Sequence, residues 1–195
     1  ELYNYYIFDQ KYNNYTIHVI YDHIDSFTYI KKWSELDEYK DKFKIYKMCR
    51  SSNKEAFFDL YCDNIKQYIN DGYIMYLDDD NYLIHNQCLN IINNSLQDYK
   101  IIVWSFLRSD KLITPNLNKL RYGEIDNCSF IYHHSIKNES NYSDIYGSDF
   151  IFINGLLKKH KASHINYTIV ATQYTETVSH IGNYKYTENN KFHNT

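Results

Sequence analysis

The chain has 195 residues, with 21 lysines and arginines against 24 aspartates and glutamates, a formal net charge of −3 and a sequence pI of about 6.3. Hydrophobic residues make up 44% and aromatic residues 18%, which is enough apolar surface for a core and argues against wholesale disorder. The nearly balanced charge argues against a nucleic-acid backbone as the main partner, and no apolar run approaches the roughly 18 residues of a membrane span.

Short strands and helices alternate along the chain. Period-2 or continuous apolar runs predict strands at 15–21, 43–48, 73–77, 101–107, 129–133 and 165–171. Three- and four-residue spacing predicts helices at 26–39, 54–69, 83–96 and 149–160, with a loop around Pro115 at 114–122. Alternation of this kind predicts an α/β fold with a mostly parallel sheet flanked by helices. We expect one domain over 1–183 and a loosely held polar tail over 184–195.

The run 73–77 (YIMYL) is typical of a central strand that is buried on both faces. It continues directly into Asp78, Asp79 and Asp80. In an extended segment Asp78 and Asp80 point to the same side, where two carboxylates suit Mg²⁺ or Mn²⁺, and such an ion can hold a diphosphate. The alternative is a solvated acidic turn that closes the strand.

The segment from Asn64 to Asn81 resembles the GT-A glycosyltransferases, specifically family 2. That family has an Asn, a Gly eight residues later, and an apolar strand that ends in a D-x-D motif; here Asn64 and Gly72 keep the offset before YIMYLDDD. Upstream, 14–23 (NYTIHVIYDH) is similar to the family's second strand. Downstream, 146–150 (YGSDF) is similar to the acidic motif before a helix. The resemblance covers about residues 5–182.

Some positions depart from the family pattern. Only residues 1–10 precede the second strand, and they read as the end of a helix, so we expect the family's first strand to be missing. Asp63 stands where an Arg often precedes the Asn, and Lys66 and Asn70 stand where small residues often follow it.

The resemblance implies a donor site and a metal site. Asp78 would contact the ribose and sugar, Asp22 the nucleobase, and Arg50 the diphosphate. Asp79 would be a further donor-binding side chain. The alternative for Asp22 is a turn former at a strand end. Asp80 and Asp78 would bind the metal, and His180 would be an additional ligand that favours Mn²⁺ over Mg²⁺. A surface or hydrogen-bonded role for His180 stays open.

For the chemical step, the resemblance makes Asp149 the base that takes the proton of the acceptor hydroxyl, which would invert the anomeric configuration. Its alternative is a helix N-cap. Asp126 would bind an acceptor hydroxyl, or be part of an ordinary turn. Trp104 would stack on a sugar ring, or pack in the core.

The resulting expectation is a hexosyltransferase that moves sugar from a nucleotide-diphospho-sugar, most often a UDP-sugar in this family, to an acceptor on a protein or glycan. The alternatives are an inert GT-A-like binding module and a nucleotidyltransferase. The 23 tyrosines against five glycines and one proline are typical of an A/T-rich genome such as that of a large DNA virus. For a protein from such a virus, a collagen-like acceptor is one candidate.

The four cysteines, Cys49, Cys62, Cys88 and Cys128, contain no C-x-x-C pair and no zinc-finger spacing. Buried free thiols in a reducing compartment are therefore expected, with disulfides as the alternative. The expected location is the cytoplasm, meaning the host cytoplasm or a virion if the source is viral.

Overall fold

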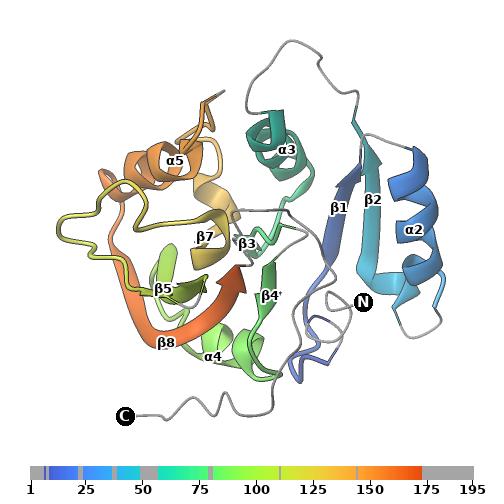
Figure 1. Ribbon diagram of the computed structural model, residues 1–195, viewed down its shortest axis with the longest axis horizontal. Helices are drawn as coiled ribbons and strands as arrows, with labels where there is room; N and C mark the ends of the chain where they lie inside the picture. Colours follow the sequence, from blue (N-terminus) through green and yellow to red (C-terminus); the bar gives the residue numbers. More distant parts are fainter. Residues whose placement is uncertain are drawn as a thin grey trace.

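The structure is a computed structural model that describes residues 7, 9–21, 24–36, 39–48, 57–78, 81–109, 111–143 and 145–172; for residues 29, 33 and 57–60 it describes the backbone alone. Two sheets form the scaffold (Figure 1). A two-stranded parallel sheet pairs β1 (Ile17–Tyr21) with β2 (Phe43–Lys47). The second sheet has six strands.

The six-stranded sheet has the order β3-β7-β5-β8-β4, and β6 pairs with β5. Its strands are β3 (Tyr73–Met75), β4 (Asn81–Leu83), β5 (Ile101–Arg108), β6 (Lys111–Ile113), β7 (Phe130–His133) and β8 (Ala162–Thr172). Strand β5 is the core of this sheet, because its first six residues (IIVWSF) are all buried. Such a continuous apolar run needs cover on both faces.

Helices cover both faces of this sheet. Ile102, Trp104 and Phe106 of β5 belong to the cluster that contains Cys88 and Ile92 of α4 (Cys88–Asn94). The alternate residues Ile101 and Val103 face the other cluster, with α3 (Phe57–Ile65) and α5 (Ser148–Leu157). The period-2 alternation of β5 therefore divides its side chains between two cores.

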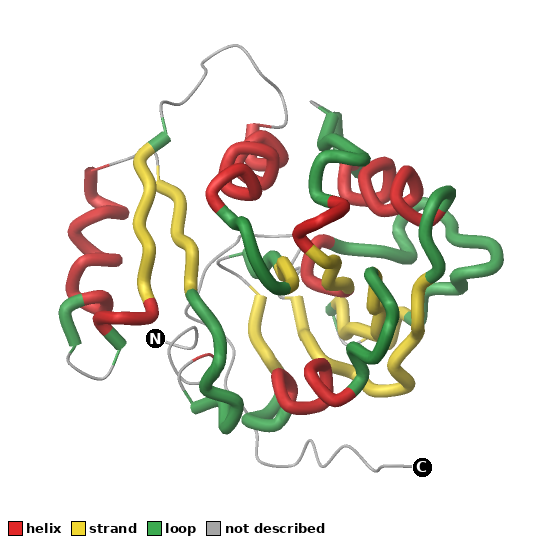
Figure 2. Tube along the Cα trace, turned by 180° about the vertical axis from the view of Figure 1, so that it is seen from behind, coloured by secondary structure: helices red, strands yellow, loops and turns green. Residues whose placement is uncertain are grey.

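Helix α2 (Ile24–Ser34) lies on the outer side of the β1–β2 pair (Figures 1 and 2). Its Phe27 and Ile30 are half-buried, as their three-residue spacing predicts, and Phe27 stacks on Tyr21 at a centroid distance of 5.0 Å. A short 3-10 turn, η1 (Lys40–Lys42), leads into β2. A second, η2 (Lys66–Tyr68), brings Tyr68 onto the Tyr46 ring of β2 at 4.3 Å.

The α/β class is confirmed, while the strand pairing is more mixed than expected. Between the described strands, only β1–β2 and β5–β8 are parallel; β3–β7, β4–β8, β5–β6 and β5–β7 are antiparallel. Periodicity reports which face of a strand is buried and carries no information on strand direction. Short returns such as the one between Arg108 and Lys111 allow antiparallel neighbours.

Three local expectations change. Among the described strands β3 pairs with β7 alone, so it is not central, and its Tyr73 and Met75 are only half-buried around a buried Ile74. The hydroxyl of Tyr73 donates to the Tyr99 carbonyl at 2.8 Å, which suits a partly exposed position. Strands β4 and β6 were not predicted, because three residues are too few to show a period. The helix expected at 83–96 is shorter in the structure, where α4 spans Cys88–Asn94. Leu83, the first residue of the expected helix, belongs to β4 instead.

The remaining 3-10 turns, η3 (Asn127–Ser129) and η4 (His134–Ile136), flank β7. Cys62, Cys88 and Cys128 are buried thiols, as expected, and Cys49 lies outside the described residues. The N-terminal segment 1–6, the end of the domain from 173 and the tail 184–195 also lie outside them.

Candidate functional site

Four charged side chains gather near the carboxyl ends of β3 and β5. Asp78 follows β3, Arg108 ends β5, Asp126 precedes η3 and β7, and Asp149 lies in the first turn of α5. Both β3 and β5 are antiparallel to β7, so they run in the same direction and end near the start of β7. In open α/β sheets this edge is where ligands bind.

Asp126 and Arg108 form the best-defined pair of this group. The Arg108 Nη2 atom lies 3.0 Å from Asp126 Oδ2, and Arg108 Nη1 donates to the Gly123 carbonyl at 3.2 Å. The other carboxylate oxygen of Asp126 accepts from Cys128 N at 3.5 Å, while its backbone N–H donates to Ser129 Oγ at 2.9 Å. Asp126 is therefore the N-cap of η3, which supports the turn alternative for this residue, and its carboxylate holds Arg108 in place.

Asp78 is exposed at the end of β3. Its Oδ2 accepts from Asn81 Nδ2 at 3.2 Å. Burial raises the pKa of the Cys128 thiol, and the negative charges of Asp126 and Asp78 act in the same direction. Asp78 follows β3 and Asp126 precedes β7, and because these strands are antiparallel neighbours, both carboxylates lie at the same edge of the sheet.

Asp149 is a half-buried carboxyl group with a raised pKa. Burial, assisted by the negative charge of Asp126, raises its pKa from 3.8 to about 6, although the Phe150 N–H at 2.8 Å and the charge of Arg108 act in the opposite direction. A carboxyl group with this pKa is mostly ionised at neutral pH and can still be protonated by a bound hydroxyl. The N-cap of α5 is Gly147, so the N-cap alternative for Asp149 is not what the structure has.

The backbone before α5 is shaped by Tyr122. Gly147 has φ +81°, the left-handed region that glycine tolerates, and a Cβ there would collide with the Tyr122 ring. The Tyr122 hydroxyl donates to the Tyr146 carbonyl at 3.3 Å, and its ring packs edge-on against Phe150. The Ser148 hydroxyl, in turn, accepts from Ser143 N at 2.6 Å. These contacts fix the start of the helix that carries Asp149.

Tyr122 and Tyr146 themselves form an exposed pair beside Asp149. Their side chains are 56% and 69% exposed, and their ring centroids lie 6.4 Å apart. Desolvation raises the pKa of the Tyr122 hydroxyl, and the neighbouring Tyr146 and Asp149 act in the same direction. The sequence did not reveal this pair, since tyrosine is so frequent in the chain that none stands out.

Arg108 was also missed, although it has a sequence signal. It is the one charged residue in the run 101–108 (IIVWSFLR), and a charge that ends a buried strand lies at the ligand-binding edge. Arg50 was predicted as the basic group instead and lies outside the described residues.

Two departures from the family pattern have a structural role. The buried Lys66 pairs with Asp63 at 2.6 Å and donates to the Ser140 carbonyl at 3.1 Å, while Asp63 accepts from Tyr142 N at 3.3 Å. This pair connects the end of α3 to the segment 140–142 that leads to α5. A buried lysine requires such partners.

Trp104 is not available to a sugar. Its side chain is fully buried, and its Nε1 donates to the Cys128 carbonyl at 3.0 Å. The stacking role proposed for it is therefore corrected to core packing, the alternative that a run of six buried residues favours.

The expected metal site is only partly described. Asp79, Asp80, His180 and the nucleobase residue Asp22 lie outside the described residues. Across the part of the chain that the structure describes, no group of three His, Cys, Asp or Glu side chains could hold a metal ion. Asp78, with exposed oxygens of the type that Mg²⁺ and Mn²⁺ prefer, fits as one ligand of such an ion.

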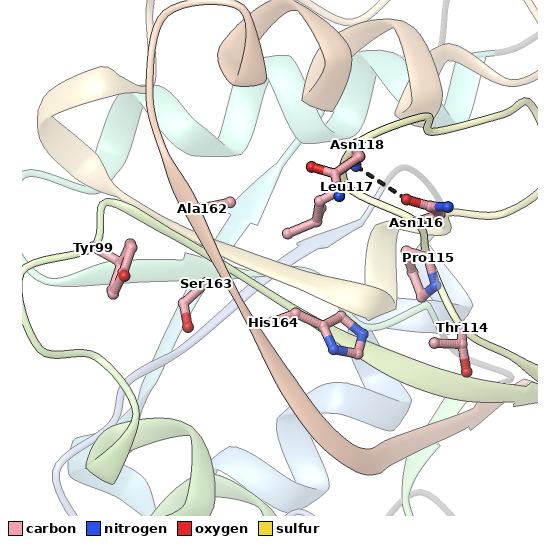
Figure 3. A pocket seen from close by; sticks show the side chains of 9 residues that line it. All are labelled: Tyr99, Thr114, Pro115, Asn116, Leu117, Asn118, Ala162, Ser163 and His164. Atoms are coloured by element: carbon pink, nitrogen blue, oxygen red, sulfur yellow. Dashed lines mark hydrogen bonds between the residues drawn. The ribbon is translucent and has the colours of Figure 1, made fainter.

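A groove of about 740 Å³ lies apart from these charged residues (Figure 3). It is lined by Tyr99, Thr114, Pro115, Asn116, Leu117, Asn118, Ala162, Ser163 and His164. None of the four charged residues of the candidate site belongs to it.

Comparison with known proteins identifies the fold. No protein-family model and no curated protein sequence matches the chain. Among solved structures, the chain is similar to residues 1–349 of TarS from S. aureus, a glycosyltransferase of the GT-A type, with a TM-score of 0.64 and 11% sequence identity. The match covers 85% of this chain and 53% of the TarS chain, so this chain spans about half of that structure. The GT-A fold expected from the sequence is thereby confirmed.

Within the described residues, no helix combines the length and the apolar character that crossing a membrane requires.

Proposed function

We propose that the chain is a glycosyltransferase that moves a sugar from a nucleotide-diphospho-sugar, a UDP-sugar, to an acceptor hydroxyl. The observation that carries the proposal is Asp149, a carboxylate with a pKa of about 6 beside Asp126 and Arg108, at the ligand-binding edge of a fold similar to that of a GT-A glycosyltransferase.

The step balances with the residues present. The acceptor oxygen attacks the anomeric carbon, the bond from that carbon to the diphosphate oxygen breaks with its electron pair, and the hydroxyl proton passes to Asp149. Attack opposite the leaving group inverts the anomeric configuration. The Arg108–Asp126 pair fixes the charge around Asp149, because Arg108 favours its ionised form and Asp126 opposes it.

For the donor, we propose that Asp78 contacts the ribose and sugar, with Asp22, Asp79 and Arg50 as further donor contacts. We propose Asp80, Asp78 and His180 as ligands of a Mn²⁺ or Mg²⁺ ion, which would supply charge neutralisation at the leaving diphosphate. Asp78 is the only one of these that the structure describes, and its exposure at the strand end supports the assignment.

For the acceptor, Tyr122 and Tyr146 support a platform beside the base. Exposed aromatic rings pack against the apolar C–H face of a sugar, and these two rings lie around the helix start that carries Asp149. We therefore propose an acceptor that presents its hydroxyl on a glycan or glycosylated protein, a collagen-like protein among them.

The test is a screen of sugar nucleotides with Mn²⁺, which measures release of the nucleoside diphosphate with and without acceptor. We expect one donor to be turned over, and Asp149→Asn to lower the rate by about 100-fold or more while donor binding is retained. The matched control is Asp98→Asn, an exposed carboxylate distant in sequence from the site. Donor binding without turnover by any sugar nucleotide would favour an inert binding module, and turnover that survives Asp149→Asn would remove the base assignment.

A further inference from the structure

Tyr142 is buried between the elements that carry Asp126 and Asp149, with only 6% of its surface exposed. The Tyr142 hydroxyl donates to Asn127 Oδ1 at 2.8 Å, and Asn127 directly follows Asp126 at the start of η3. The Tyr142 ring stacks on Phe152 of α5 at a centroid distance of 4.3 Å, and Phe152 lies one turn after Asp149. One buried side chain therefore links the turn of Asp126 to the helix of Asp149.

The backbone around Tyr142 is held from both sides. Tyr142 N donates to Asp63 Oδ1 at 3.3 Å, and Asp63 itself pairs with the buried Lys66 near the end of α3. Ser143 N donates at 2.6 Å to the hydroxyl of Ser148, the first residue of α5. Helices α3 and α5 both pack on the same face of the large sheet (Figure 1). The segment that leads into α5 is therefore tied to both helices, and this holds the Tyr142 ring in place.

The hydroxyl is the part of Tyr142 that apolar packing does not require. A buried hydroxyl costs free energy unless it is hydrogen-bonded, and Asn127 supplies its acceptor. A phenylalanine at this position would keep the stack on Phe152 and lose only the bond to Asn127. The hydroxyl therefore makes a connection between η3 and α5 that the ring alone does not make.

The pKa of Asp149 depends on how α5 is placed against η3. Burial is the largest cause of its raised pKa, Asp126 acts in the same direction, and Arg108 acts in the opposite one. The charge of Asp149 also acts on the hydroxyls of Tyr122 and Tyr142, whose raised pKa values keep both neutral at pH 7. A shift of α5 away from η3 would admit water to the Asp149 carboxyl and increase its distance from Asp126.

We propose that Tyr142 is a positioning residue for the transfer reaction, because its hydroxyl bond to Asn127 holds the helix of Asp149 against the turn of Asp126. The inference rests on the proposed function, in which Asp149 is the base. Tyr142 is buried and acts through Asp149, without contact to donor or acceptor.

The experiment compares two deletions of a single buried hydroxyl. Tyr142→Phe removes the bond to Asn127. The matched control, Tyr132→Phe, removes the hydroxyl that lies 2.9 Å from the Tyr76 hydroxyl in the same apolar cluster, a bond that involves neither η3 nor α5. We expect Tyr142→Phe to lower the pKa of Asp149 from about 6 towards 3.8, and Tyr132→Phe to leave it unchanged.

The pKa is measured by ¹³C NMR of the full chain labelled with ¹³C-aspartate, where the Asp149 signal is identified by its absence in Asp149→Asn. In the transfer assay, Tyr142→Phe should lower kcat by about tenfold with the donor KM unchanged, and the acid limb of the pH–rate profile should move to lower pH. Asn127→Ala should have the same effects and serves if Tyr142→Phe does not fold. Combining both changes should add nothing further, since they remove the same bond.

An unchanged pKa of Asp149 in Tyr142→Phe and Asn127→Ala, an equal shift in Tyr132→Phe, or fully additive effects of the two changes would overturn the proposal. The NMR titration needs no turnover. Failure of the sugar-nucleotide screen would therefore overturn the proposed function, while the titration separately decides whether Tyr142 positions Asp149.

Discussion

Because its pKa is raised, we predict that Asp149 in its ionised form destabilises the folded chain. The carboxyl has a pKa of about 6 in the folded chain against an ordinary value of 3.8, so ionisation is opposed by burial and by Asp126. This difference corresponds to a penalty on the order of 3 kcal/mol once the group is ionised in both states. Asp149→Asn removes the charge and keeps an oxygen that can accept from the Phe150 N–H.

The sign of the effect depends on pH. At about pH 3, below the ordinary pKa of 3.8, the carboxyl is largely protonated in both the folded and the unfolded chain, so Asp149→Asn changes little; well above the folded pKa of about 6 the parent carries the full penalty and the variant does not. We therefore expect the variant to have a higher free energy of unfolding than the parent at about pH 8, by up to ~3 kcal/mol, with the difference disappearing near pH 3.

Urea denaturation of both proteins at the two pH values measures this difference. Asp98→Asn, on the exposed surface, should have little effect at either pH. An equal gain at both pH values, or a variant less stable than the parent at the higher pH, would refute the reasoning that burial of an ionised Asp149 is costly.

Three further predictions concern the same site and the core. Arg108→Ala removes the positive charge that favours ionised Asp149, so the pKa of Asp149 should rise and the acid limb of the pH–rate profile should move to higher pH. The control is Arg121→Ala, because the Arg121 side chain is 68% exposed; it should leave both the pKa and the profile unchanged. Tyr146→Ala should raise the acceptor KM by about tenfold and leave donor hydrolysis unchanged, whereas Tyr167→Ala, also at an exposed tyrosine, should affect neither. An equal acceptor KM in the two variants would exclude Tyr122 and Tyr146 as the acceptor platform. In a Cys49→Ser background, Cys62, Cys88 and Cys128 should not react with Ellman's reagent until the chain unfolds, because all three thiols are buried and burial raises the pKa of Cys88 to about 11. Rapid labelling of the folded chain would contradict the buried placement of these cysteines.

Much of the fold follows from local patterns in the chain. Alternation in the runs 17–21 and 43–47 gives β1 and β2, and the apolar run 101–108 gives the buried strand β5, because burial on one or both faces dictates those sequences. The D-x-D segment was found because it directly follows an apolar run, whereas the acidic motif at the start of α5 and Asp126 were found through the resemblance to the GT-A family. Asp78, Asp126 and Asp149 lie at one edge of the sheet.

The sequence by itself determined which segments become strands and helices and which acidic residues lie at their ends, since these properties depend on near neighbours in the chain. Only the tertiary structure decided that most strand pairs of the large sheet are antiparallel, that Trp104 is enclosed, and that Arg108 is held against Asp126 near Asp149. Each of these depends on contacts between residues far apart in the chain, such as Trp104 with Cys128 and Arg108 with Asp126. The same long-range packing sets the pKa of Asp149, because that value reflects burial and neighbouring charge that its own helix does not supply.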